Sequence, residues 1–384
     1  MKSLLLVAFG LALSLVLAEA ALRILGVAFD ASLFDDDPIT GWRLRPNAEG
    51  WWVSEGHAYV RINSAGMHDR EYPVEKPRDT VRIAVLGDST TAAFQVDVEQ
   101  NFCRVLERKL AGCDAYGGKR VEVMNFGVPG FGTAQELLTF RHRVLRYQPD
   151  AVILAFYTLN DVHNNHRALN PVDASKSPYF LLRGDELVLD NSFRKTQGRQ
   201  MYVRLRKAFA NVVNRSRVTQ LMAELVIRRM LFTLAQRPEM TERTNRFGAH
   251  VDDLIYGPPE VPEMKEAWRV TEALLLALNN EARSHGVRFR IVTLWQSPQD
   301  RPPALREDEV RQRQIKDLFY PDRRLEEFAR RHDIPAIVLA PRVAEYAARH
   351  HEPLAFERYE PGHYNDSGHR FIGEAIGERL CAGL

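Results

Sequence analysis

The order of apolar and polar positions predicts strands and helices in alternation. Runs of apolar, often β-branched residues predict buried strands over residues 81–86, 121–125, 151–157, 288–294 and 334–339. Apolar positions at helical spacing predict helices over residues 98–111, 134–146, 263–284, 322–331 and 367–380. Alternating strands and helices form parallel sheets covered on both faces. The fold class is therefore predicted to be α/β, a three-layer α/β/α flavodoxin-like sandwich with a five-stranded parallel sheet.

Two segments do not follow this alternation. Residues 27–80 are rich in Trp, Pro and Gly and hold short alternating pieces such as residues 58–62, so they predict a small irregular β region. Residues 166–262 are too long for a loop and contain helical periodicity, so they predict an inserted helical cap. The α/β domain is then expected to consist of residues 81–165 and 263–384.

The first 26 residues have the pattern of an export signal. Lys2 precedes an apolar run over residues 4–18, and the apolar character continues to residue 25. The protein is therefore expected to be exported across the cytoplasmic membrane, with its bulk on the periplasmic or extracellular face and residues 4–25 as an anchor.

Two interpretations of this segment are open. The uninterrupted run would span only ~22 Å as a helix, less than the ~30 Å hydrocarbon core, and residues 18–20 form a small-x-small cleavage site. These features favour a cleaved signal peptide. The extension to residue 25, and a possible pair between Glu19 and Arg23 one helical turn apart, favour an uncleaved anchor, which we prefer.

Charge is unevenly distributed along the chain. The 384 residues carry a formal net charge of only +2, which gives no indication of a nucleic-acid partner. Between residues 194 and 237, however, there are eleven Lys or Arg and one acidic residue, within a stretch of helical periodicity from 201 to 237. This basic segment is either a solvated helix face or a surface for an anionic membrane or an acidic polymer.

The three cysteines do not form a disulfide framework, because their number is odd. A bridge between Cys103 and Cys113 is conceivable in an oxidising compartment, although the helical pattern around Cys103 predicts that this thiol packs in the core. The sequence has neither metal-ligand spacing nor a glycine-rich phosphate loop, so no metal and no cofactor are predicted.

Polar residues suited to acyl transfer follow three of the predicted strands. Gly87-Asp88-Ser89 ends the first strand, where Gly permits a sharp turn and the following helix can direct its free amides at an anion. Alone, this tripeptide is more often a helix cap. Asn125 to Gly130 and Asn160-Asp161 end the next two strands. The amides of Ser89, Gly130 and Asn160 could then converge as an oxyanion hole.

A fourth block, from Glu360 to His369, precedes the last predicted helix. In order and position, the four blocks resemble those of SGNH (GDSL-like) hydrolases. The anchor, the β region and the insertion resemble exported bacterial members associated with polysaccharide O-acetylation or deacetylation. The resemblance implies that Ser89 is the nucleophile, that Ser89, Gly130 and Asn160 form the oxyanion hole, and that His363 is the general base. Asp88 and Asp161 are expected to support the site.

The chain departs from the family pattern at two positions. Glu360 stands where the family usually has Asp three residues before its His, and Glu can hold an imidazole as Asp does, so Glu360 is expected to orient His363. Thr158 replaces a Gly two residues before the oxyanion Asn and is expected to narrow the cleft. A competing pair, Asp366 and His369, is less favoured, because Asp366 suits the N-cap of the last helix and His369 a structural role.

The predicted function is that of a serine-dependent acyl ester hydrolase or O-acyltransferase, acting on acetyl esters of an envelope or secreted polysaccharide. Its partners are then an acylated carbohydrate, or another ester, and the membrane through the N-terminal segment, with no nucleic acid. Two alternatives are open: a lipase or phospholipase at the membrane surface, and a non-catalytic carbohydrate-binding scaffold.

Overall fold

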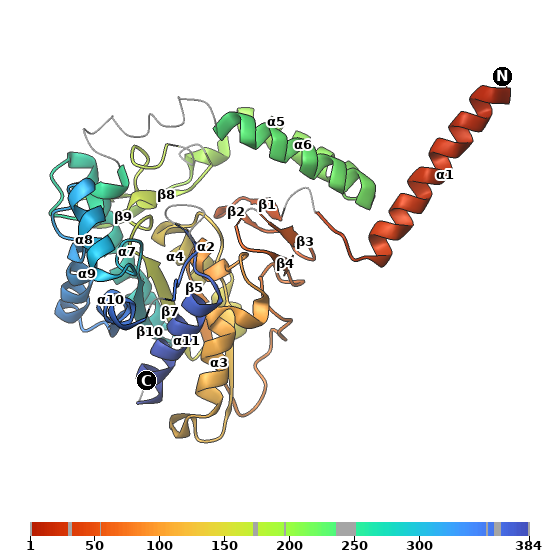
Figure 1. Ribbon diagram of the computed structural model, residues 1–384. Helices are drawn as coiled ribbons and strands as arrows, with labels where there is room; N and C mark the ends of the chain where they lie inside the picture. The colour runs from red at the N-terminus through yellow and green to blue at the C-terminus, as the bar shows by residue number, and fades with distance from the viewer. Residues whose placement is uncertain are drawn as a thin grey trace.

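Five parallel strands form the centre of the protein in a computed structural model (Figure 1). The structure describes residues 2–29, 33–53, 55–171, 176–195, 197–235, 251–350, 352–356 and 362–382. The strands are β5 (Thr80–Leu86), β6 (Arg120–Asn125), β7 (Ala151–Tyr157), β10 (Arg288–Leu294) and β11 (Ala336–Val338). Their order across the sheet is β6-β5-β7-β10-β11, which is the flavodoxin-like order. The predicted α/β fold class is confirmed.

Helices cover both faces of this sheet, because successive side chains of each strand point to opposite sides. In β5, Ala84 and Leu86 join one hydrophobic cluster, and Ile83 and Val85 join another. The helices of the first cluster are α4 (Thr133–His142), α7 (Pro262–Ser284) and α9 (Tyr320–Arg331). Those of the second are α3 (Phe102–Ala111), α10 (Ala340–Arg349) and α11 (Asp366–Cys381). Sequence periodicity did not predict α10 or the surface helix α8 (Pro303–Gln312).

The N-terminal β region packs against this α/β sandwich. It consists of two antiparallel pairs, β1 (Phe34–Asp37) with β2 (Gly41–Leu44) and β3 (Glu49–Trp52) with β4 (Ala58–Arg61). Their buried side chains Leu44 and Val60 share a cluster with Phe94 and Phe131, which follow β5 and β6. Because burying an aliphatic or aromatic side chain contributes roughly 1.5–3 kcal/mol, this shared cluster fixes the β region near the carboxyl ends of the strands.

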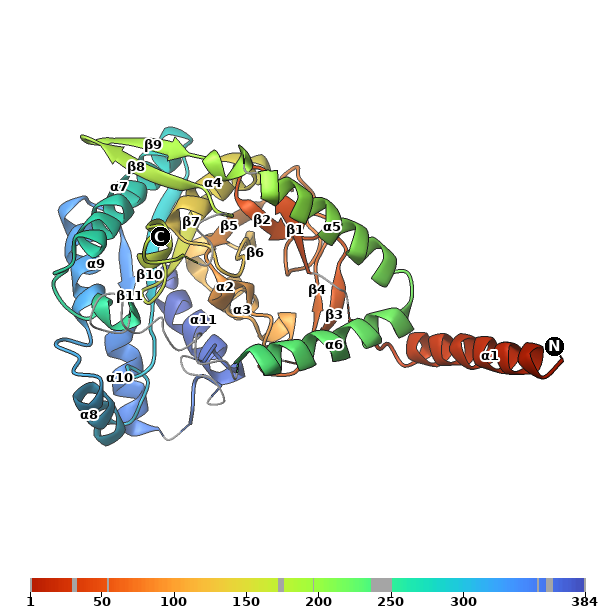
Figure 2. The same cartoon turned by 90° about the horizontal axis from the view of Figure 1, so that it is seen from above.

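The long interruption between β7 and α7 contains both strands and helices. It includes the antiparallel pair β8 (Tyr179–Arg183) and β9 (Glu186–Asp190), followed by α5 (Gln197–Val213) and α6 (Arg217–Ala235). The helices α5 and α6 form a hairpin that projects from the body (Figures 1 and 2). The sequence thus predicted helices in this interruption, but it did not predict the hairpin of β8 and β9. Our division of the chain into domains stays a prediction.

The N-terminal helix α1 (Lys2–Ile24) extends away from the folded body (Figure 1). It is apolar and long enough to cross a membrane, and none of its described residues is buried. This arrangement fits a signal or anchor sequence, since a helix of the core would bury its apolar face.

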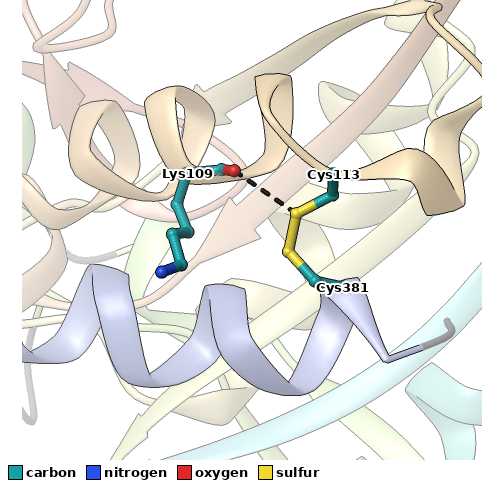
Figure 3. The surroundings of a disulfide bond; sticks show 3 residues. All are labelled: Lys109, Cys113 and Cys381. Atoms are coloured by element: carbon teal, nitrogen blue, oxygen red, sulfur yellow. Dashed lines mark hydrogen bonds between the residues drawn. A yellow bond between two sulfur atoms is a disulfide. The ribbon is translucent and has the colours of Figure 1, made fainter.

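One disulfide links the end of α3 to the end of α11, between Cys113 and Cys381 (Figure 3). The bridge considered from the sequence, Cys103 to Cys113, is wrong, because Cys103 lies in the core as a free, buried thiol. Its predicted core position is confirmed. The Cys113–Cys381 bridge joins residues 268 positions apart, and closing so long a loop typically stabilises a fold by about 2–4 kcal/mol.

Candidate active site

Ser89 is the first residue of a single helical turn, α2 (Ser89–Ala92), directly after β5. Gly87 permits this sharp turn, since a Cβ there would lie 2.1 Å from the Thr91 hydroxyl. Asp88 caps the turn: one of its carboxylate oxygens accepts hydrogen bonds from the Thr90 amide at 2.8 Å and the Thr90 hydroxyl at 2.6 Å. The strand end thus presents Ser89 above the carboxyl edge of the sheet.

His363 reaches Ser89 from the segment that precedes α11. Its Nε2 lies 2.9 Å from the Ser89 hydroxyl. The segment is held by a β-bridge between Ala355 and Tyr364, and by a hydrogen bond of 2.8 Å from the Phe356 amide to the His363 carbonyl. The His363 side chain is 31% exposed, so a substrate can approach the Ser89–His363 pair.

The carboxylate that holds His363 belongs to Glu55, in the turn between β3 and β4. One oxygen of Glu55 lies 2.5 Å from His363 Nδ1, and the other accepts a hydrogen bond of 2.8 Å from the His363 backbone amide. The Glu55 side chain is only 8% exposed. With Nδ1 bound in this way, Nε2 is the ring nitrogen left to take a proton from Ser89.

Sequence reasoning gave no role to Glu55. It lies in a segment that the sequence predicted only as an irregular β region, and outside the four recognised blocks. Glu360, which the sequence predicted for this task, lies outside the described residues. The only local signal is Gly56, whose φ of +70° and close approach to the Gln95 carbonyl, 2.2 Å from a Cβ placed there, favour glycine.

The proposed oxyanion donor Gly130 lies in the loop after β6 with a φ of +80°. A Cβ at this position would lie 3.2 Å from the Trp42 ring, which comes from the N-terminal β region. The Trp42 indole donates a hydrogen bond of 2.9 Å to the Pro129 carbonyl and packs edge-on against Phe131. The β region therefore supports this loop as well as His363.

Asn160 follows β7 and donates a hydrogen bond of 2.9 Å from its side-chain amide to the second carboxylate oxygen of Asp88. A carboxamide nitrogen carries two hydrogens, so this bond leaves one for an oxyanion. Asp88 consequently caps the turn that begins at Ser89 and orients Asn160. Thr158, expected to narrow the cleft, is fully buried, with its hydroxyl 3.5 Å from the Leu294 carbonyl.

Asp161 holds the segment that carries Asn160 against the end of β7. One carboxyl oxygen accepts a hydrogen bond of 2.8 Å from the Tyr157 amide. Burial raises the pKa of Asp161 well above its usual range, and the nearby carboxyl groups of Glu136 and Asp88 raise it further. Burial likewise raises the pKa of Glu136, whose oxygens have no hydrogen-bond partner among the described residues. Burial therefore favours the neutral forms of Asp161 and Glu136 near Asp88.

The competing pair, Asp366 and His369, is not brought together as a catalytic pair. His369 is 1% exposed and stacks on Phe102, as expected for a structural histidine. Asp366 is exposed at the first position of α11, and the N-cap is Asn365, whose side chain accepts a hydrogen bond of 3.0 Å from the Gly368 amide. The prediction of Asp366 as the cap was therefore wrong by one residue.

The buried His369 is expected to make stability depend on pH. Burial lowers its pKa to about 3, whereas an exposed histidine titrates near ~6.5. Between these values only the unfolded chain binds the proton, so the free energy of unfolding falls as pH falls, by up to about 1.4 kcal/mol per pH unit. Urea unfolding should show that the free energy of unfolding falls between pH 7 and 4.5, and that this fall is about 2–3 kcal/mol larger in wild type than in His369→Phe. Equal losses would contradict this assignment.

Ser89, His363 and Glu55 thus form a hydrogen-bonded series of hydroxyl, imidazole and carboxylate. Ser89 follows β5, His363 precedes α11, and Glu55 lies in the turn between β3 and β4. Such a series can generate an alkoxide nucleophile and stabilise the resulting imidazolium. The amides near Gly130 and Asn160 are suited to the negative charge that develops on an attacked carbonyl.

No protein-family model matches the chain, and no curated protein matches its sequence. Solved structures similar in fold include an acetyl xylan esterase (12% identity, TM-score 0.40, covering 78% of this chain and 100% of the other). Another is a catalytic mutant of an acetylxylan esterase from Geobacillus stearothermophilus (13% identity, TM-score 0.41, covering 79% of this chain and 95% of the other). A third is a lipase/acylhydrolase from Enterococcus faecalis (14% identity, TM-score 0.38, covering 79% of this chain and 96% of the other). The likeness to these two esterases and to this lipase/acylhydrolase concerns the fold alone.

Proposed function

We propose that the protein is a serine-dependent ester hydrolase or acyltransferase that works through an acyl-enzyme. One observation carries this proposal: Ser89 Oγ lies 2.9 Å from His363 Nε2, and His363 Nδ1 lies 2.5 Å from a buried carboxylate oxygen of Glu55. A structural role for all three groups would not require a partly exposed serine and histidine aligned in this way.

The reaction follows from this geometry. His363 Nε2 takes the Ser89 proton while Oγ attacks the ester carbonyl, and Glu55 stabilises the imidazolium that forms. The oxyanion is held by the Ser89 and Gly130 amides and by the free hydrogen of the Asn160 carboxamide. Collapse of this intermediate breaks the bond to the alcohol, which leaves with the proton from His363. Water, or a second hydroxyl, then attacks the acyl-enzyme in the same manner and releases Ser89.

The proposed site of action is the outer side of the cytoplasmic membrane. Disulfides persist in oxidising compartments, and Cys113 and Cys381 are bridged. The apolar, unburied α1 is suited to a tether. Both features support export. Together with the resemblance of the anchor, the β region and the insertion to exported members associated with polysaccharide O-acetylation or deacetylation, they favour acetyl esters on an envelope or secreted polysaccharide as substrates.

Hydrolysis of p-nitrophenyl esters of increasing chain length tests the chemistry and the acyl preference together. We expect kcat/KM for the acetate to exceed that for the palmitate by at least about 10-fold, since an acetyl pocket excludes longer chains. A preference for palmitate would identify a lipase instead. Absence of both turnover and labelling by a fluorophosphonate probe would contradict catalysis and favour the scaffold alternative. Release of acetate from an acetylated polysaccharide, compared with its transfer to a sugar hydroxyl, separates hydrolase from transferase.

A further inference from the structure

The hairpin of α5 and α6 leaves apolar side chains exposed in rows. On α5, Met201, Leu205, Phe209 and Val212 are between 53% and 63% exposed and recur at helical spacing. On α6, Met222, Leu225 and Val226 are between 57% and 64% exposed. Continuous apolar rows of this kind are unusual on a surface that faces only water.

Basic residues accompany these rows. Arg204, Lys207 and Arg215 are exposed, and α5 contains no acidic residue. A helix with apolar residues on one part of its surface and cations on another is typical of elements that lie in the interface of an anionic bilayer.

The hairpin is also attached to the proposed anchor. Glu19, near the end of α1, accepts hydrogen bonds of 2.8 Å from the Ser216 hydroxyl and 3.1 Å from the Val218 amide, at the turn between α5 and α6. In Figure 2 the two helices diverge from this turn as a V, whereas in Figure 1 they overlap along one line and α1 leaves steeply from their joined end. If α1 crosses a bilayer, the membrane surface therefore lies along the hairpin. It meets α1 where the apolar run ends at Glu19 and Arg23.

We propose that the α5–α6 hairpin is an interfacial membrane-binding element that lies on an anionic lipid surface beside α1. The exposed apolar rows enter the boundary between headgroups and acyl chains, and Arg204, Lys207 and Arg215 contact lipid phosphates. This inference goes beyond the proposed function, because it concerns how the protein is held and requires no particular acyl chemistry.

The hairpin contacts the N-terminal β region that carries Glu55. Arg217, at the start of α6, forms an ion pair of 3.0 Å with Glu49 on β3. The same strand leads into the turn that carries Glu55, the partner of His363. Docking of the hairpin would therefore set the orientation of the catalytic edge relative to the membrane, in place of free rotation about a single tether.

Site-specific fluorescence on the full chain tests this proposal. Among the native cysteines, Cys103 is buried and Cys113 and Cys381 are bridged, so an introduced surface thiol can be labelled selectively. An environment-sensitive NBD dye is attached to Leu205→Cys or Phe209→Cys. The matched control is Leu305→Cys, on α8, because Leu305 is 58% exposed and Leu205 63%. The proteins are placed in nanodiscs of phosphatidylcholine with or without phosphatidylglycerol.

At positions 205 and 209, we expect blue-shifted emission that doxyl-labelled lipids quench at least about two-fold, and at position 305 water-like emission without quenching. Adding Arg204→Glu and Lys207→Glu should reduce quenching at position 205 in phosphatidylglycerol discs more than in neutral discs. Water-like emission at both 205 and 209 would overturn the proposal. Blue-shifted emission that lipids do not quench would also overturn it and indicate a protein partner or a second copy. These readouts do not depend on ester turnover.

Discussion

Ser89→Ala is expected to reduce kcat for p-nitrophenyl acetate by roughly 10⁴- to 10⁶-fold, because it removes the atom that forms the acyl-enzyme. KM should change little, since the oxyanion donors near Gly130 and Asn160 remain. The fold should be unaffected, because the serine hydroxyl faces His363 and the turn is capped by Asp88. Initial rates and labelling by a fluorophosphonate probe, followed by mass spectrometry, measure both effects.

Ser192→Ala is the matched control for this substitution. Ser192 is exposed in the insertion, and its backbone amide donates a hydrogen bond to Asp190. This variant should retain wild-type turnover and should still label at Ser89. Persistent turnover in Ser89→Ala, or labelling at another serine, would show that Ser89 is not the nucleophile.

Glu55→Gln is expected to reduce kcat by about 10³- to 10⁴-fold while leaving the shape of the side chain nearly unchanged. The glutamine amide can no longer stabilise the imidazolium, and it can present a hydrogen where Nδ1 requires an acceptor. Glu55→Asp should recover part of the activity, because the charge is kept and only the reach is shortened. Pre-steady-state burst kinetics should show that the loss lies in the rate constant of the acylation step and not in substrate binding.

Glu360→Gln is the informative comparison, because the sequence predicted Glu360 for the same task. We expect this variant to stay within about three-fold of wild type, since the carboxylate at His363 Nδ1 is that of Glu55. A large loss in Glu360→Gln, together with a small loss in Glu55→Gln, would restore Glu360 as the orienting acid and reduce Glu55 to a structural partner of the His363 backbone.

Much of the fold and part of the site could be predicted from the chain alone. Strand runs and helical periodicity are local, so they predicted the sheet of β5, β6, β7, β10 and β11 to within a few residues. In a parallel sheet the carboxyl ends of the strands share one edge, and this rule predicted that Ser89 and Asn160 would lie near each other. In the structure, Asn160 donates a hydrogen bond to Asp88, and Ser89 begins the turn that Asp88 caps.

Only the tertiary structure decided which distant segments complete that edge. Glu55 lies 308 positions from His363 in an irregular turn, and neither periodicity nor spacing marks such a residue as a catalytic partner. The pairing of Cys113 with Cys381 was equally hidden, because it depends on α11 packing along α3. The apolar rows of α5 and α6 were visible as a pattern, yet the same pattern suits a buried helix. The sequence by itself determined the local conformations and the serine at the strand end, whereas long-range packing determined which carboxylate contacts His363, the disulfide and the exposure of the hairpin.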